Sequence, residues 1–262
     1  MKQKVMMKSL DAAYDIVSVV TIPDTDTKSE NYPVVVLCHG TGSNKDEVGN
    51  LYVELASKLA ETGIASVRFD FVGNGESKED YIGYTLTSAV NDVKSAVEYI
   101  KQNPLLDETR MGIVGFSQGG SVAALSVGAI EEFKCMVGWS AALSLESLAT
   151  DEMRKTADAQ GWAWLDFDFR DSVRLSKQWM DETAEMDLLP ILKERHLPML
   201  GIAGTLDTVV PCECSKKMVE ATNHPDSELY FVETDHIFSV FEHDRAWPKV
   251  IAKTASWLKE QL

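Results

Sequence analysis

The sequence has little positive charge and no long apolar run. It contains 25 lysine and arginine residues against 41 aspartate and glutamate residues, which gives a formal net charge of −16. Nucleic acids and anionic membrane surfaces are bound by patches of lysine and arginine, so this composition argues against both partners. No segment approaches the roughly 20 apolar residues that a membrane-spanning helix needs. The composition fits a soluble protein that acts on small or neutral substrates, and the simpler explanation of the acidity is that it maintains solubility.

The N-terminal segment lacks the pattern of a secretory signal. Residues 1–10 contain lysines, but no apolar stretch follows them, and Asp11 and Asp15 fall where such a stretch would lie. We therefore expect a cytoplasmic location.

The few cysteines and glycine-rich loops do not form a metal or cofactor pattern. Cys38 and Cys135 lie in apolar runs, where cysteine behaves as a small hydrophobic residue. Cys212 and Cys214 are spaced more tightly than the usual zinc ligands, and no second pair matches them. The loop at 73–75 lacks the third glycine and the helix start of a dinucleotide-binding loop. We expect no metal ion and no cofactor.

Apolar runs and amphipathic stripes alternate along most of the chain. A weakly alternating segment at 15–22 is typical of an antiparallel edge strand. Stripes at 48–61 and 90–100 have helical spacing. The continuous apolar runs typical of strands buried on both faces are 34–38, 64–69, 111–114, 133–139 and 197–203. This order predicts an α/β protein with a mostly parallel, doubly wound sheet and helices on both faces.

One acidic, aromatic-rich region interrupts the alternation. We expect residues 1–141 and 188–262 to form the α/β core and residues 142–187 to form an inserted cap, because long irregular insertions are often functional. Residues 162–169 alternate in polarity, which suggests a short strand or hairpin with Trp162 and Trp164 on one face. The alternative is a helical excursion whose aromatic side chains fill their own core.

Residues 115–120, with the sequence GFSQGG, have the pattern of a nucleophile elbow. An apolar run precedes them and a helical segment follows, which is the strand–turn–helix context that this G-x-S-x-G pattern requires. Side chains at Gly115 or Gly119 would collide with neighbouring backbone in such a turn. Ser117 would lie at the tip, at the positive end of the following helix, where a developing oxyanion is stabilised.

Ser117, Asp207 and His236 each follow a predicted strand. Ligands of doubly wound sheets bind at the carboxyl ends of the strands, so the three residues fall on one edge. Their chain order, serine, acid, histidine, is that of the nucleophile-elbow hydrolases. His236 would accept the Ser117 proton, and Asp207 would fix the imidazole tautomer. Asp235 is the alternative acid, but adjacent side chains of an extended segment point apart.

The first buried strand ends in His39 and Gly40, and the loop after it is placed to complete an oxyanion hole. We assign the donors as the backbone N–H groups of Thr41 and Gln118. We expect His39 to hold the loop by hydrogen bonds rather than to act in catalysis.

With these motifs the sequence resembles the α/β-hydrolase superfamily, and more closely the bacterial cinnamoyl/feruloyl esterases and their serine-aminopeptidase-like and monoacylglycerol-lipase-like relatives. The resemblance implies an α/β-hydrolase fold with a catalytic triad. Relatives usually carry a bulky residue at the position of Thr41, which here alters the floor of the acyl pocket. The residues that carry the resemblance are His39 and Gly40, 68–70 with 73–77, 115–120, 204–211, and Asp235 with His236.

These features favour a serine carboxylic ester hydrolase that acts through an acyl-enzyme on a small-molecule ester. Trp162 and Trp164 in the cap suggest a cinnamoyl- or feruloyl-type acyl group, bound by stacking. If the rings pack inward, an aliphatic acyl pocket is as well supported. The alternatives in the same fold are a monoacylglycerol lipase, an aminopeptidase that binds an amine through Asp166 or Asp168, and an acyltransferase. A non-catalytic small-molecule binder and a homodimer paired through cap strands also remain open.

Overall fold

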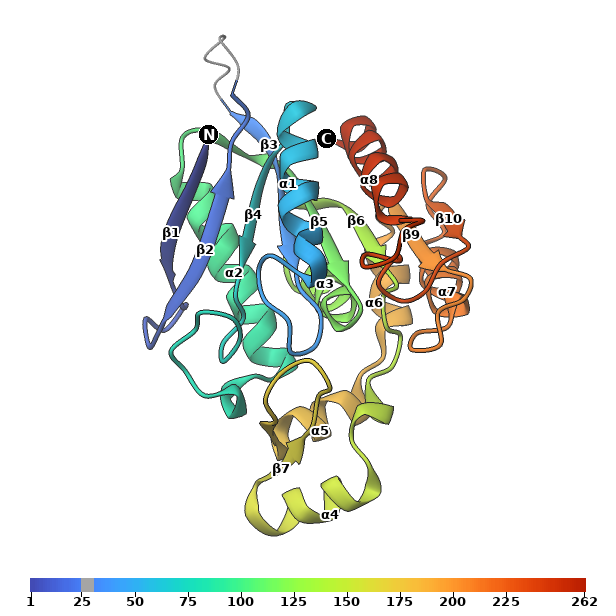
Figure 1. The fold of residues 1–262 in the computed structure, drawn as a ribbon. Helices are drawn as coiled ribbons and strands as arrows, with labels where there is room; N and C mark the ends of the chain where they lie inside the picture. The colour runs from blue at the N-terminus through green and yellow to red at the C-terminus, as the bar shows by residue number, and fades with distance from the viewer. Residues whose placement is uncertain (25–30) are drawn as a thin grey trace.

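A sheet of eight strands runs through the computed structural model, which describes residues 1–24 and 31–262 (Figure 1). β1 and β2 are antiparallel, as are β2 and β4, whereas the other neighbouring strands are parallel. The predicted mostly parallel sheet is confirmed. In spatial order the strands are β1 (Lys2–Lys8), β2 (Asp15–Thr21), β4 (Ala65–Phe69), β3 (Tyr32–Cys38), β5 (Leu106–Phe116), β6 (Phe133–Trp139), β9 (Met199–Gly204) and β10 (Glu228–Val232).

Helices cover both faces of the sheet (Figure 1). α1 and α8 contact each other over one face, and α2, α3, α6 and α7 form a row of contacts over the other. None of the helices in the described residues is both long and apolar enough to cross a membrane. The helix bounds are α1 (Leu51–Glu61), α2 (Leu86–Gln102), α3 (Gln118–Ala129), α6 (Leu188–Arg195), α7 (Cys212–Thr222) and α8 (Trp247–Gln261).

The central strand β3 explains why the sheet needs helices on both sides. Val34 and Val36 belong to the hydrophobic core under α2 and α3, whereas Val35 and Leu37 belong to the core under α1 and α8. Successive side chains of a strand point to opposite faces, so a continuous apolar run buries residues on both. The apolar runs therefore predicted the layers correctly.

Strand β1 was not predicted. Six of its seven residues are exposed or only partly buried, and Met7 is the buried one. An exposed edge strand needs no apolar pattern, and β1 forms because its backbone pairs with β2 from end to end. The strand expected at 15–22 is β2. Because β1 pairs with its outer side, β2 lies second in the sheet and not at its edge.

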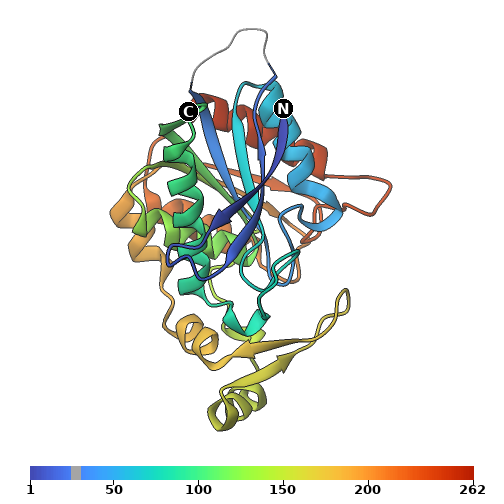
Figure 2. The same ribbon diagram turned by 90° about the vertical axis from the view of Figure 1, so that its left-hand side faces the viewer.

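Residues 142–187 contain short elements that lie together at one end of the sheet, at the bottom of Figures 1 and 2. β7 and β8 form an antiparallel hairpin, as the alternation at 162–169 suggested. β8 contacts the short helix η2 (Tyr81–Gly83), and α5 contacts α2. The elements are η3 (Glu146–Leu148), α4 (Asp151–Gln160), β7 (Trp162–Leu165), β8 (Val173–Ser176) and α5 (Lys177–Glu185). We call residues 142–187 the cap.

Candidate active site

Ser117 occupies a strained turn between β5 and α3. Its backbone has φ 53° and ψ −121°, which a non-glycine residue adopts at a cost of about 1–3 kcal/mol. A Cβ atom at Gly115 would overlap the carbonyl of Gly119, and one at Gly119 would overlap the carbonyl of Cys38. Hydrogen bonds hold the strained residue: its N–H donates to Trp139 O (2.9 Å). The turn therefore has the geometry of the predicted elbow.

Asp207 and His236 come from the loops after β9 and β10 and form a hydrogen bond of 2.7 Å between Oδ2 and Nδ1. The Asp207 side chain is fully buried, and its Oδ1 also accepts hydrogen bonds of 2.8 Å from the N–H groups of Val209 and Val210. Burial opposes ionisation of Asp207, but the hydrogen bonds from His236, Val210 and Val209 outweigh it and lower the pKa of the carboxyl. Because the Asp207 carboxylate is hydrogen-bonded to Nδ1, Nε2 is the ring nitrogen of His236 that is left to accept a proton.

His236 lies beside the elbow. Its ring packs on that of Phe116, the residue before Ser117, with centroids 5.0 Å apart. The neighbouring Asp235 turns the other way, because its Oδ1 accepts a hydrogen bond of 2.7 Å from the N–H of Ser239. The structure thus brings Asp207, and not Asp235, to the histidine.

The side chains of Thr41 and Gln118 meet. Thr41 Oγ1 donates to Gln118 Oε1 at 2.6 Å, and Gln118 Nε2 donates to the hydroxyl of Tyr84 at 2.6 Å. Gln118 and Tyr84 are buried. These bonds join the loop after β3 to the start of α3, the two segments whose backbone N–H groups we expect to bind an oxyanion.

Two buried groups hold the loop after β3. His39 Nδ1 contacts Gly40 O at 2.9 Å, and His39 Nε2 accepts a hydrogen bond from the N–H of Phe71. Burial lowers the pKa of His39 despite the nearby charge of Glu47, so the ring is neutral and donates through Nδ1. Glu47 in turn accepts from the N–H of Gly40 at 2.7 Å and from the hydroxyl of Ser43 at 2.6 Å. His39 thus positions the loop, as its sequence context suggested.

A cavity of about 930 Å³ lies between this edge of the sheet and the cap, and Ser117, His236 and Thr41 all line it. Most of the remaining lining is apolar, with Arg170 and Glu47 as its charged members. The cap side is lined by Ala142, Ser144, Leu145, Ser147, Leu148, Phe167, Phe169 and Arg170. An apolar pocket with a few convergent polar groups is the usual form of a small-molecule site.

Trp162 and Trp164 are not among the described residues that line this cavity. Their rings contact each other edge to face, with centroids 5.2 Å apart, and Arg174 lies over Trp162 at 5.6 Å. The Trp164 residue is 55% exposed. The structure therefore does not bring the two tryptophans to this cavity. The aromatic residues of the cap at the cavity, Phe167 and Phe169, come from the loop after β7, whose conformation no periodicity encodes, and Phe116 and Phe241 line it from the core.

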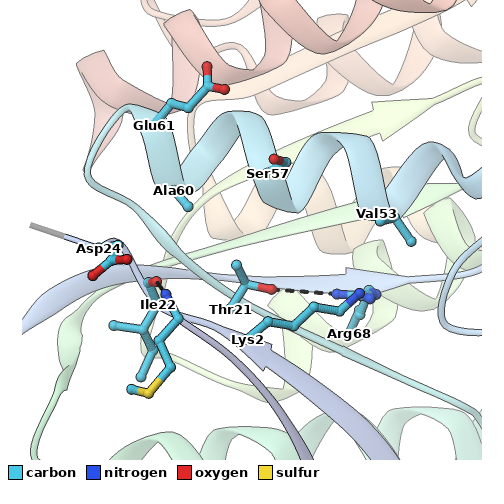
Figure 3. Close-up of a pocket in the computed structure, with 10 residues that line it drawn as sticks. Lys2, Thr21, Ile22, Asp24, Val53, Ser57, Ala60, Glu61 and Arg68 are labelled. Atoms are coloured by element: carbon cyan, nitrogen blue, oxygen red, sulfur yellow. Dashed lines mark hydrogen bonds between the residues drawn. The ribbon is translucent and has the colours of Figure 1, made fainter.

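A second, smaller cavity of about 390 Å³ lies between β2 and α1 (Figure 3). Arg68 lines it, and its guanidinium is already paired with Asp46 at 2.9 Å. None of the predicted site residues is among the described residues that line this cavity. Among the described residues, no cluster of histidine, cysteine or acidic side chains has the arrangement of a metal site.

Solved structures share this fold. Est1E from Butyrivibrio proteoclasticus, determined with ferulic acid bound, superposes with a TM-score of 0.78 over 98% of each chain, at 18% identity. The α/β hydrolase GrgF from Penicillium sp. sh18 superposes with a TM-score of 0.80 over 100% of this chain and 99% of its own, at 17% identity. The predicted α/β-hydrolase fold is confirmed.

Sequence comparison shows which family the chain belongs to. An uncharacterized 31.7 kDa protein from Escherichia coli is 21% identical over 92% of this chain and 94% of its own. The acylamino-acid-releasing enzyme of Rattus norvegicus is 22% identical over 88% of this chain, but over only 32% of the enzyme. The model of the serine aminopeptidase family, S33, matches residues 29–187. That range is more than half of the chain, which therefore belongs to the serine aminopeptidase (S33) family of α/β-hydrolases.

Proposed function

We propose that the protein is a serine carboxylic ester hydrolase. His236 Nε2 removes the proton of the Ser117 hydroxyl as Ser117 Oγ attacks the ester carbonyl, and the N–H groups of Thr41 and Gln118 bind the resulting oxyanion. Asp207 stabilises the imidazolium. His236 then protonates the departing alcohol, and the same groups activate a water molecule that hydrolyses the acyl-enzyme.

The observation that carries the proposal is the 2.7 Å hydrogen bond between Asp207 and His236 on the cavity that Ser117 also lines. A serine hydroxyl is a poor nucleophile without a base, and a histidine is a reliable base only in the correct tautomer. The strain at Ser117 supports a functional role, because strained backbone concentrates at functional sites.

An ester fits the cavity better than a peptide with a free amine. An amine would need a carboxylate at the site, and the sequence offered Asp166 and Asp168 for that role. Both are exposed, neither is among the described lining residues, and Asp166 accepts a hydrogen bond from Ser172 at 2.6 Å. The charged cap residue at the cavity is instead the cation Arg170.

The apolar lining supports a substrate whose acyl group has an apolar part, and an aryl group is one such part. Phe167 and Phe169 have ring centroids 5.1 Å apart and both line the cavity, so they are the candidates to stack on an aryl ester of the feruloyl type. We further propose that residues 142–187 act as a cap that selects the acyl group, and that the enzyme works in the cytoplasm.

The test combines kinetics with covalent labelling. The unmodified protein should hydrolyse short-chain esters and take up one fluorophosphonate per chain, whereas Ser117→Ala should do neither. Ser57→Ala removes an exposed serine from α1 and should behave as the unmodified protein. Full activity of Ser117→Ala would contradict the mechanism, and an intact protein that neither hydrolyses esters nor reacts with the probe would support a non-catalytic binder.

A further inference from the structure

Arg170 reaches from the cap into the active-site cavity. Its Nη1 donates a hydrogen bond of 2.7 Å to the carbonyl of Gly42, in the loop after β3. The guanidinium also lies over the rings of Tyr81 and Phe167, at 5.6 and 5.7 Å from their centroids. Arg170 is therefore held between the cap and the loop that carries Thr41.

Arg170 has no carboxylate at ion-pair distance in the part of the chain that the structure describes. Among the described residues, none forms an ion pair with Arg170, and the bond to Gly42 is its one hydrogen bond. A guanidinium has five N–H donors. Arg170 is partly buried, and its remaining donors have no hydrogen-bond partner among the described residues.

Two other cations of the cap are ion-paired, whereas Arg154, among the described residues, donates only to the carbonyls of Met180 and Glu146. Arg174 forms an ion pair with Asp80, and Lys177 pairs with Asp158 at 3.1 Å and with Asp181 at 2.7 Å. Within the described part of the chain, Arg170 therefore lacks the counter-ion that Arg174 and Lys177 have, and unlike Arg154 it lines the cavity.

The acidic residues nearest to Arg170 in sequence do not neutralise it. Asp168 and Asp171 flank it in the same loop, and both are exposed to solvent. The other charged residue of the cavity lining is Glu47, whose carboxylate oxygens are taken by Ser43 and by the N–H groups of Gly40 and Val48. Of the two charged residues in the described lining, Arg170 is therefore the one with hydrogen-bonding groups left for a ligand.

We propose that Arg170 is a specificity-determining residue that binds a carboxylate on the substrate, so that the preferred substrates are esters with an anionic group. The proposal rests on ester hydrolysis at Ser117. A guanidinium binds a carboxylate through two parallel hydrogen bonds, and the partly desolvated cavity strengthens such a pair.

The position of Arg170 limits the length of the substrate. Gly42 follows Thr41 directly, and consecutive Cα atoms are about 3.8 Å apart, so the guanidinium lies on the order of 10 Å or less from the oxyanion donor of Thr41. A carboxylate a few carbon atoms from the scissile carbonyl spans this distance. Monoesters of four- and five-carbon dicarboxylic acids have that geometry.

The experiment measures charge selectivity with matched esters. Monomethyl glutarate carries the carboxylate on the acyl side and is compared with methyl pentanoate, and the pentanoyl ester of glycolate carries it on the alcohol side and is compared with ethyl pentanoate. The unmodified protein should prefer the anionic member of at least one pair in kcat/KM. Arg170→Gln should lower that preference by about tenfold or more, which is the usual effect of removing a charge-assisted hydrogen bond. Arg170→Lys should restore part of it.

Arg174→Gln is the matched control, because it removes a cap arginine of the same charge whose partner is Asp80 and which is not among the described lining residues. Its charge selectivity should stay within about twofold of the unmodified protein. If Arg170→Gln slows both members of each pair equally, Arg170 serves only to hold Gly42, and the proposal is overturned.

A binding measurement separates this proposal from the proposed function. Ser117→Ala should bind glutarate in calorimetry, and Ser117→Ala with Arg170→Gln should bind it at least about tenfold more weakly. Ester turnover that depends on Ser117 but ignores substrate charge would overturn the role of Arg170 alone. Glutarate binding that depends on Arg170, without any ester turnover, would contradict the proposed hydrolase function and support an anion-binding site at Arg170.

Discussion

The hydroxyl of Thr41 and the side-chain carbonyl of Gln118 are joined by a hydrogen bond of 2.6 Å, although 77 positions separate the two residues. The bond fixes the distance between the loop after β3 and the start of α3. Our mechanism takes one oxyanion donor from each of these segments. The side-chain bond therefore sets the spacing of two backbone donors.

We expect Thr41→Val to lower kcat by about tenfold with little change in KM, because misplaced donors weaken binding of the transition state more than binding of the ester. The variant also leaves the buried Gln118 Oε1 without its donor, at a cost of about 1–3 kcal/mol in the free energy of unfolding. Thr41→Ser keeps the hydroxyl and should retain most of kcat. A loss of activity in Thr41→Ser that Thr41→Val does not show would mean that the methyl group, and not the bond, matters.

The Asp207–His236 bond predicts a large effect of a small substitution. Asp207→Asn keeps the shape of the side chain but favours the wrong tautomer of His236, so kcat should fall by about 10³–10⁴. Asp235→Asn is the control, because an amide oxygen still accepts the hydrogen bond of Ser239 and the residue does not contact the imidazole ring. A larger loss in Asp235→Asn than in Asp207→Asn, measured by steady-state kinetics, would reverse the assignment of the acid.

The sheet and the placement of Ser117, Asp207 and His236 on one edge of it could be predicted from the sequence, because both follow from local patterns. An apolar run that is buried on both faces marks a strand, and the parallel strands then carry their following loops to one edge. Arg170 and Phe167 could not be predicted in this way. Their contacts with Gly42 and the cavity depend on how a loop of the cap folds back over the sheet, and no periodicity encodes that path.

The same limit explains Trp162 and Trp164. Their alternation correctly places both rings on one face of β7, where they contact each other. Which face of the hairpin turns toward the sheet is decided by tertiary contacts of β8 with η2. A pattern with period two therefore groups side chains without saying which group meets the substrate.

Substitution of the cap aromatics tests which residues contact the acyl group. Phe167→Ala should lower kcat/KM for methyl ferulate by about fivefold relative to methyl butanoate, because a lost aromatic contact is worth about 1 kcal/mol beyond burial. Trp164→Ala should leave this ratio unchanged, since the residue is half exposed and is not among the described lining residues. A change of the ratio in Trp164→Ala alone would show that the tryptophans, and not Phe167, contact the acyl group.

Asp92 makes the stability of the fold depend on pH. Its carboxylate is buried in α2, where it accepts a hydrogen bond of 2.6 Å from the hydroxyl of Tyr14 and one of 3.0 Å from the N–H of Val72. Burial raises the pKa of Asp92 to about 7, although the two hydrogen bonds act in the opposite direction. The carboxyl of an unfolded chain has a pKa of about 3.9.

Between these two values the folded protein holds a proton that the unfolded chain has released. The free energy of unfolding should therefore decrease as the pH rises from about 4 to about 7, by up to about 1.4 kcal/mol per pH unit, and this contribution should be constant above that window. Asp92→Asn stays neutral and lacks this dependence, while its amide still bonds Tyr14 and Val72. Urea unfolding at pH 5 and pH 8 should show that the stability of the variant relative to the unmodified protein is greater at the higher pH. A difference that is the same at both values would mean that Asp92 is ionised in the folded protein throughout this range.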